Sequence, residues 1–144
     1  MNTLVVCPSC EKLNRVALNR TSDGQPVCGN CKSELPLHGG VQDISGAALT
    51  KLIRIADMPV IVDFWAQWCG PCKAFAPTFK MAAQELGGQI IFAKLDTEKF
   101  PEAAQKLQIR SIPTLMVFKN GIEVDRQSGA MPLPTLMNYL SRWK

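Results

Sequence analysis

The sequence lacks any hydrophobic run that approaches the roughly 20 residues needed to cross a membrane. Its first segment, residues 1–7, also lacks the basic stretch and the long apolar stretch of a secretion signal. These two absences argue against a membrane-spanning protein and against an exported one. We therefore expect a soluble protein of the cytoplasm.

A strong excess of charge is also missing, because the net charge is only +4. Residues 1–42 hold four basic and three acidic side chains, and residues 43–144 hold twelve and nine. This weak and even distribution excludes the basic groove of a nucleic-acid-binding protein and the basic patch of a membrane-surface protein. No Gly-x-Gly-x-x-Gly fingerprint occurs, so the chain is predicted to hold no dinucleotide and no other organic cofactor.

Histidine occurs once, as His38, within the connector Pro-Leu-His-Gly-Gly at residues 36–40. The turn residues of this connector predict a boundary between a small module, residues 1–37, and a larger domain, residues 38–144. The module is short of long apolar runs, so it cannot bury enough apolar surface to fold alone and needs a staple. We interpret His38 as a linker residue.

The six cysteines all lie in Cys-x-x-Cys pairs, and the first two pairs are separated by 17 residues. This spacing is typical of a zinc site in which four thiolates form a closed tetrahedral shell. One structural Zn²⁺ per chain would then supply the folding energy of a zinc ribbon. The alternatives are two disulfides or a site that changes with redox state. The predicted ligands are Cys7, Cys10, Cys28 and Cys31.

The larger domain alternates helix-like and strand-like patterns. This alternation predicts an α/β sandwich, a mixed central sheet flanked by helices. The expected hairpin turns at Asn120-Gly121, and Val60 to Trp65 reads as a strand covered on both faces. The predicted helices are 47–56, 69–86, 102–107 and 131–143, and the predicted strands are 60–65, 90–95, 114–118 and 122–128.

The third cysteine pair, Cys69 and Cys72, follows the predicted buried strand and opens a helix. At a helix N-terminus, free N–H groups and the helix dipole stabilise a thiolate. A spacing of three residues puts both sulfurs on one helix face, close enough for a disulfide. This context favours redox chemistry over half a zinc site. Cys69 is predicted to be the exposed nucleophile, and Cys72 the thiol that resolves the mixed disulfide.

The segment from Trp65 to Lys73, Trp-Ala-Gln-Trp-Cys-Gly-Pro-Cys-Lys, resembles the active site of the thioredoxin family. The resemblance extends from about Val41 to Lys144, and it implies the thioredoxin fold. Together with the N-terminal cysteines, the whole chain resembles the bacterial thioredoxin 2 group, which carries a zinc-binding extension. In that group the extension is thought to modulate the redox domain.

A carboxylate within the apolar strand, Asp63, has two interpretations. It faces solvent, or it is buried with a raised pKa and accepts a proton from Cys72. The resemblance favours the second role, and it places Lys94 near Asp63. Lys94 has the alternative of being an ordinary solvated strand residue.

The family resemblance also implies a docking surface for the client protein. Ile112 and Pro113 match its cis-proline loop, in which the residue before the proline pairs with the client backbone. Ser111 departs from the family, where glycine is common, and this position lies near the docking surface. Other positions implied to frame that surface are Trp68, Gly70, Pro71, Gly121, Gly129 and Ala130.

The resemblance implies a monomeric protein-disulfide reductase, which an NADPH-dependent thioredoxin reductase recharges and which acts on disulfide-containing client proteins. Two alternatives remain at this point. A protein with the same fold can instead form or rearrange disulfides, as an oxidase or isomerase. The Gly-Pro pair between the cysteines and the predicted zinc thiolates favour a reducing compartment. The chain can also be a zinc-dependent redox sensor or chaperone-like binding module.

Overall fold

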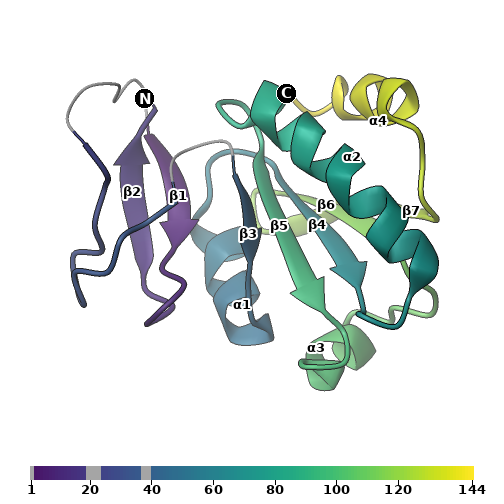
Figure 1. Ribbon diagram of the computed structural model, residues 1–144, viewed down its shortest axis with the longest axis horizontal. Coiled ribbons are helices and arrows are strands. Elements are labelled where there is room, and N and C mark those ends of the chain that lie inside the picture. Colours follow the sequence, from purple (N-terminus) through teal and green to yellow (C-terminus); the bar gives the residue numbers. More distant parts are fainter. Residues whose placement is uncertain (1, 19–23, 37–39) are drawn as a thin grey trace.

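The computed structural model describes residues 2–18, 24–36 and 40–144. In these ranges the chain forms a five-stranded mixed sheet with helices on both faces, beside a two-stranded sheet (Figure 1). No helix in the described ranges is both long and apolar enough to cross a membrane. The elements are β1 (Asn2–Val6), β2 (Leu13–Ala17), β3 (Val41–Asp43), α1 (Gly46–Ile55), β4 (Val60–Trp65), α2 (Gly70–Leu86), β5 (Ile91–Asp96), α3 (Pro101–Lys106), β6 (Thr114–Lys119), β7 (Ile122–Ser128) and α4 (Leu133–Leu140).

The large sheet has the strand order β3-β5-β4-β6-β7. Strands β3, β5 and β4 run parallel, whereas β6 and β7 are added as an antiparallel hairpin. The central strand is β4, whose continuous apolar run is buried on both faces, as the sequence predicted. The α/β sandwich is therefore confirmed.

The two faces of β4 belong to two different hydrophobic cores. Val60, Val62 and Phe64 pack with α1, whereas Ile61 packs with α2 and α4. Because side chains alternate along a strand, Asp63 shares the face of Ile61 and points toward the layer that contains α2. The pattern of the strand therefore brings a carboxylate under the helix that carries the dithiol.

The predicted boundaries of α1, α2, β4 and β5 agree with the structure to within one residue. The hairpin turn is also confirmed, since Asn120 and Gly121 have positive φ values of 54° and 81°. The last helix, predicted over 131–143, is wrong at both ends. It begins only at Leu133, and after Leu140 the hydrogen bonds tighten to three-residue spacing in a final turn.

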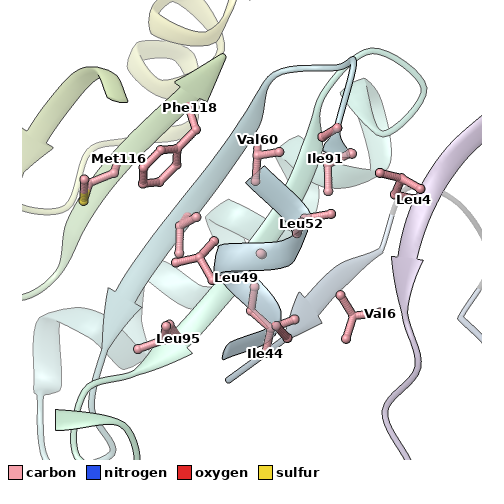
Figure 2. Packing of buried hydrophobic residues seen from close by; sticks show 14 of the residues in the cluster. Leu4, Val6, Ile44, Leu49, Leu52, Val60, Ile91, Leu95, Met116 and Phe118 are labelled. Carbon is pink, nitrogen blue, oxygen red and sulfur yellow. The ribbon is translucent and has the colours of Figure 1, made fainter. Parts of the chain in front are cut away.

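The N-terminal module packs on the larger domain through β1. Leu4 and Val6 join the core that contains Ile44, Leu49 and Leu52, and each of the five is at most 5% exposed (Figure 2). Strand β1 therefore contributes two side chains to the core of the redox domain, whereas the module keeps a separate small core: Val5, Cys7, Val16, Cys28 and Leu35. The sequence did not predict this docking.

Gln42 of β3 joins the two parts by hydrogen bonds. Its side-chain amide accepts from the N–H of Val6 at 2.7 Å and donates to the carbonyl of Leu4 at 3.0 Å. Strand β3 itself was missed, because it has only three residues. The predicted boundary after residue 37 and the linker residue His38 lie outside the described residues.

Candidate functional site

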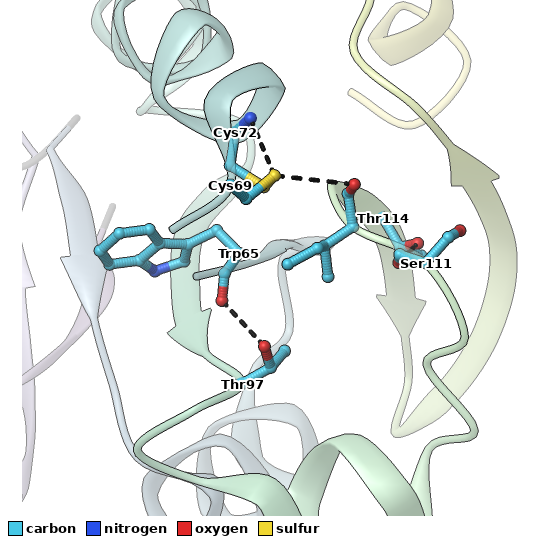
Figure 3. Close-up of a disulfide and its surroundings, with 7 residues drawn as sticks. Trp65, Cys69, Cys72, Thr97, Ser111 and Thr114 are labelled. Carbon is cyan, nitrogen blue, oxygen red and sulfur yellow. Dashed lines mark hydrogen bonds between the residues drawn. A yellow bond between two sulfur atoms is a disulfide. The ribbon is translucent and has the colours of Figure 1, made fainter. Parts of the chain in front are cut away.

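Cys69 and Cys72 form a disulfide at the N-terminus of α2, as the sequence predicted (Figure 3). Cys69 is the N-cap residue, and its Sγ accepts the backbone N–H of Cys72 at 3.2 Å. In this form Cys69 is only 4% exposed, less than predicted, and Cys72 is 2% exposed. The Sγ of Cys69 lies 3.8 Å from the carbonyl oxygen of Ile112, and this contact covers it.

The local sequence explains why the dithiol is at this position. The buried strand β4 ends at Trp65, and a turn follows in which the N–H of Cys69 bonds to the carbonyl of Ala66 at 3.2 Å. Pro71 fits in the first turn of α2, where its missing N–H costs no hydrogen bond. The free N–H groups and the dipole of this helix end stabilise negative charge on Sγ of Cys69 once the disulfide is reduced.

A loop with a cis peptide bond between Ile112 and Pro113 faces the dithiol, which confirms the expected cis-proline. Two hydrogen bonds fix this loop. The N–H of Gly129 donates to the carbonyl of Pro113 at 2.8 Å, and the hydroxyl of Thr114 donates to the carbonyl of Ser111 at 2.6 Å. Gly129 is thereby brought beside the proline.

The surface around the dithiol is exposed and partly apolar. Trp68 is 68% exposed and lines a shallow hollow with Ile112 and Arg110. Gly121 does not belong to this surface, because the β6–β7 turn lies at the opposite end of the sheet, beside Ile53. Among the implied docking residues, Trp68 and Ile112 line this hollow, Gly70 and Pro71 adjoin Cys69 in α2, and Gly129 bonds to Pro113; Ala130 follows Gly129 along the chain.

Asp63 is a buried carboxyl group, 3% exposed, and its Oδ1 has no hydrogen-bond partner. Burial raises the pKa of Asp63 to about 7, and the positive charge of Lys94 offsets part of this effect. Lys94 lies directly opposite Asp63 on the neighbouring strand β5. At neutral pH this carboxyl group can therefore either accept or release a proton.

Lys94 has a contact that sequence reasoning missed. Its Nζ lies 4.7 Å from the centre of the Trp65 ring, within the range of a cation–π interaction. Trp65 lies two residues after Asp63 and so shares its face of β4. The alternation of the strand contained this information, but the parallel register of β4 and β5 was needed to bring Lys94 to the ring.

The four N-terminal cysteines lie together, and their Sγ atoms are all within 4.8 Å of one another. Two of the separations, Cys7–Cys31 and Cys10–Cys28, are 3.6 Å. Four sulfurs arranged tetrahedrally around Zn²⁺ at 2.3 Å would lie about 3.8 Å apart. The cluster therefore fits a four-coordinate metal ion.

Hydrogen bonds lower the pKa of Cys28 and Cys31 and so favour their thiolates, whereas burial and the neighbouring thiols raise the pKa of Cys7. The backbone N–H groups of Cys31 and Asn30 and the side chain of Asn14 lower the pKa of Cys28 to about 6, against the effect of burial. Asn14 also accepts the N–H of Gly29 at 3.0 Å, and so it joins β2 to the turn that carries Cys28. Sequence reasoning missed Asn14, since nothing in the cysteine spacing indicates which side chains support the ligands. Metal ligation requires such thiolates.

Comparison with known proteins gives a consistent result. A family model for thioredoxin matches residues 40–142. Thioredoxin C-3 of Corynebacterium nephridii is 37% identical over 140 residues, which cover 96% of this chain and 94% of that protein. The thioredoxin of Synechocystis sp. is 42% identical over 100 residues, 69% of this chain and 94% of the relative. The crystal structure of Malassezia sympodialis thioredoxin matches with a TM-score of 0.67 and 34% identity, over 73% of this chain and 91% of that one.

The matched segment contains both cysteines of the disulfide, the buried Asp63 and the cis-proline loop. The match to Thioredoxin C-3 also extends into the N-terminal module, which the family model leaves out. The chain belongs to the thioredoxin family, and it is a thiol-disulfide oxidoreductase that reduces protein disulfides.

Proposed function

We propose that Cys69 attacks the disulfide of a client protein and that Cys72 completes its reduction. The Cys69 thiolate forms a bond to one client sulfur, and the second client sulfur leaves with the electron pair and takes up a proton. Cys72 then loses its proton and attacks Sγ of Cys69, which releases the reduced client and leaves the Cys69–Cys72 disulfide. The observation that supports Cys69 as the attacking thiol is the hydrogen bond from the N–H of Cys72 to Sγ of Cys69, because this bond stabilises negative charge on that sulfur.

The proton of Cys72 passes to Asp63 in this proposal. Asp63 lies on the face of β4 toward α2, and its Oδ1 is free of other hydrogen bonds. A base is most effective when its pKa lies near the working pH, and burial gives Asp63 a pKa of about 7. Lys94 supports this group by offsetting part of the cost of its charge.

The client chain is proposed to lie across Trp68, the cis-proline loop and the Gly129–Ala130 segment. The backbone of Ile112 faces the dithiol and is available beside Cys69. Gly129 has a φ of +95° and no atom within 4 Å of the place where a Cβ would stand, so a client backbone can approach closely there. Ser111 lies on the rim of this surface, where its side chain is exposed.

Replacement of Asp63 by asparagine is expected to stabilise the fold at pH 8 and not at pH 4. The pKa of Asp63 is raised in the folded state, so the folded protein binds more protons than the unfolded chain between these values. Stability is therefore lost as pH rises from about 4 to 7, up to about 4 kcal/mol. Urea unfolding at both pH values measures the difference, and release of the client from the mixed disulfide should also slow.

Asp57→Asn is the matched control, since Asp57 is exposed. That variant should show the same free energy of unfolding as the wild type at both pH values. Equal stabilisation by Asp63→Asn at pH 4 and pH 8 would contradict a raised pKa. An unchanged rate of client release would contradict the proton transfer.

Electrons are proposed to reach the oxidised dithiol from NADPH through thioredoxin reductase, since the sequence has no nucleotide fingerprint. The test is NADPH oxidation in a mixture of the chain, thioredoxin reductase and insulin as the client. We expect steady oxidation only when all three are present with NADPH. Electron transfer from NADPH to the Cys69–Cys72 disulfide in the absence of the reductase would contradict this route.

The cysteine cluster is proposed to hold one Zn²⁺ through Cys7, Cys10, Cys28 and Cys31, as in the thioredoxin 2 group. Zn²⁺ would supply a closed structural centre, without catalysis, because all four positions are filled by protein sulfur. We place the module at residues 1–37 and the redox domain at 38–144, in a monomer. A thiolate metal site and a reducing dithiol both suit the cytoplasm.

A further inference from the structure

Four polar side chains share the face of the sheet under α2, at the end that carries the dithiol. Asp63 and Trp65 come from β4, and Lys94 and Asp96 come from β5. The register pairs Asp63 with Lys94 and Trp65 with Asp96, so Lys94 and Trp65 are diagonal neighbours. The Lys94 ammonium group therefore has three possible partners on this face, the carboxyl groups of Asp63 and Asp96 and the ring of Trp65.

The ammonium group of Lys94 is placed on the indole. Its Nζ lies 4.7 Å from the centre of the Trp65 ring, and both side chains are half-buried. Within the described ranges the structure contains one ion pair, Arg126 with Glu123, so Lys94 and Asp63 are not in contact. Oδ1 of Asp63 is left without a partner although an ammonium group lies on the adjacent strand.

The remaining partner, Asp96, is already engaged. Its Oδ1 accepts the backbone N–H groups of Glu98 and Lys99, at 2.9 and 3.2 Å. Nε1 of Trp65 has no hydrogen-bond partner, so the indole acts here through its ring face. Removal of the water around an ammonium group strengthens its attraction to an aromatic ring.

We propose that Trp65 is a positioning residue of the reaction: its ring holds the Lys94 ammonium away from the Asp63 carboxyl group and so keeps that group free to exchange a proton with Cys72. This inference rests on the proposed role of Asp63. A direct ion pair would stabilise the carboxylate and make it a poor proton acceptor. The ring therefore keeps the cation near enough to moderate the cost of charge, but not in contact.

The other charged and titratable groups that face Asp63 are few. Strand β5 contributes Lys94 and Asp96. Helix α2, which covers this face, carries the two cysteines at its N-terminus, and its nearest charged residue, Lys73, is exposed. The partner on β6 is Leu115, which carries no charge. In the disulfide form the cysteines do not titrate, so the Asp63 carboxyl can be followed without interference from them.

The experiment is a ¹³C NMR titration of the Asp63 carboxyl carbon in the oxidised, full-length protein. The variants are Trp65→Leu, Trp65→Phe, Lys94→Met and the double variant Trp65→Leu/Lys94→Met. In Trp65→Leu the released ammonium is expected to approach Asp63 and lower its pKa by about one unit. Trp65→Phe keeps a ring face and should restore most of the wild-type value.

The double variant distinguishes the proposal from the alternative that loss of the ring lets water reach Asp63, which would also lower its pKa. If Trp65 acts through Lys94, Trp65→Leu should not lower the pKa of Asp63 in a protein that already carries Lys94→Met. A similar fall in both backgrounds would overturn the inference, and so would an unchanged pKa in Trp65→Leu. Trp68→Leu is the matched control, because Trp68 is exposed, and it should leave the Asp63 titration unchanged.

Fluorinated tryptophan provides a second test that does not depend on the folding of Trp65→Leu. Successive fluorine atoms weaken the ring face with little change of shape, so the Asp63 pKa should fall in steps, and no steps should appear in Lys94→Met. A flat series would overturn the inference. Because the titration needs no turnover, its failure is distinct from a failure of Asp63→Asn to slow client release, which concerns the proposed function alone.

Discussion

Cys69→Ser is expected to reduce insulin no faster than the uncatalysed reaction, whereas the wild type turns over. A serine hydroxyl at the helix N-terminus is not ionised at neutral pH, so the helix end has no thiolate to stabilise. The N–H of Cys72 would still be present, but it would face a neutral oxygen instead of a charged sulfur. The measurement is the initial rate of insulin reduction with NADPH and thioredoxin reductase.

Cys72→Ser is the matched partner of that variant. It retains the attacking thiolate and lacks the resolving thiol, so it should accumulate a stable mixed disulfide between Cys69 and the client. Mass spectrometry of the non-reduced mixture detects this adduct. Undiminished reduction by Cys69→Ser, or an adduct on Cys72 in place of Cys69, would contradict the assignment of the two thiols.

Cys28→Ser is expected to lose the metal entirely, from one Zn²⁺ per chain to none. Cys28 is fully buried, and its Sγ accepts N–H groups from Asn30 and Asn14. Without the metal the module would have too little apolar area to fold, since the proposed Zn²⁺ would supply most of its folding energy. Metal analysis after gel filtration measures the stoichiometry, and hydrogen exchange at the amides of β1 and β2 reports the unfolding.

The effect should extend into the redox domain. Leu4 and Val6 would leave the core they share with Leu52, which lowers the free energy of unfolding by about 3 kcal/mol. The control is Cys69→Ser, which should retain Zn²⁺ and full amide protection in β1. Protected β1 amides in metal-free Cys28→Ser would contradict a structural metal. Activity that appears only after metal removal would instead indicate a regulatory site.

The parts of the structure that the sequence predicted are those set by short-range pattern. Val60 to Trp65 is apolar at almost every position, and a helix opens at Cys69 and Gly70 with proline in its first turn. These local signals determine the buried strand, the helix and the position of the dithiol between them. The cysteine spacing likewise predicted that the four thiols of the module lie together, as they do in the structure.

The features that the sequence did not predict depend on contacts between distant segments. Strand β3 has three residues, and its pairing with β5 gives it its identity as a strand. Gln42 reads as an ordinary polar residue until β1 is placed beside it. The Trp65–Lys94 contact needs the register of two strands, which no single segment contains.

Gln42 also has a consequence for association between chains. One edge of β1 pairs with β2, and its other edge pairs with no strand of the described residues. Strand β3 is the end strand of the large sheet. The Gln42 amide occupies backbone groups of Leu4 and Val6 that would otherwise be free on β1, and β1 lies beside β3 (Figure 1). Unpaired strand edges are templates for the addition of strands from other molecules. A chain that lost the proposed Zn²⁺, and with it this docking, would offer such an edge together with two apolar side chains. The proposed metal would therefore also protect the protein against aggregation.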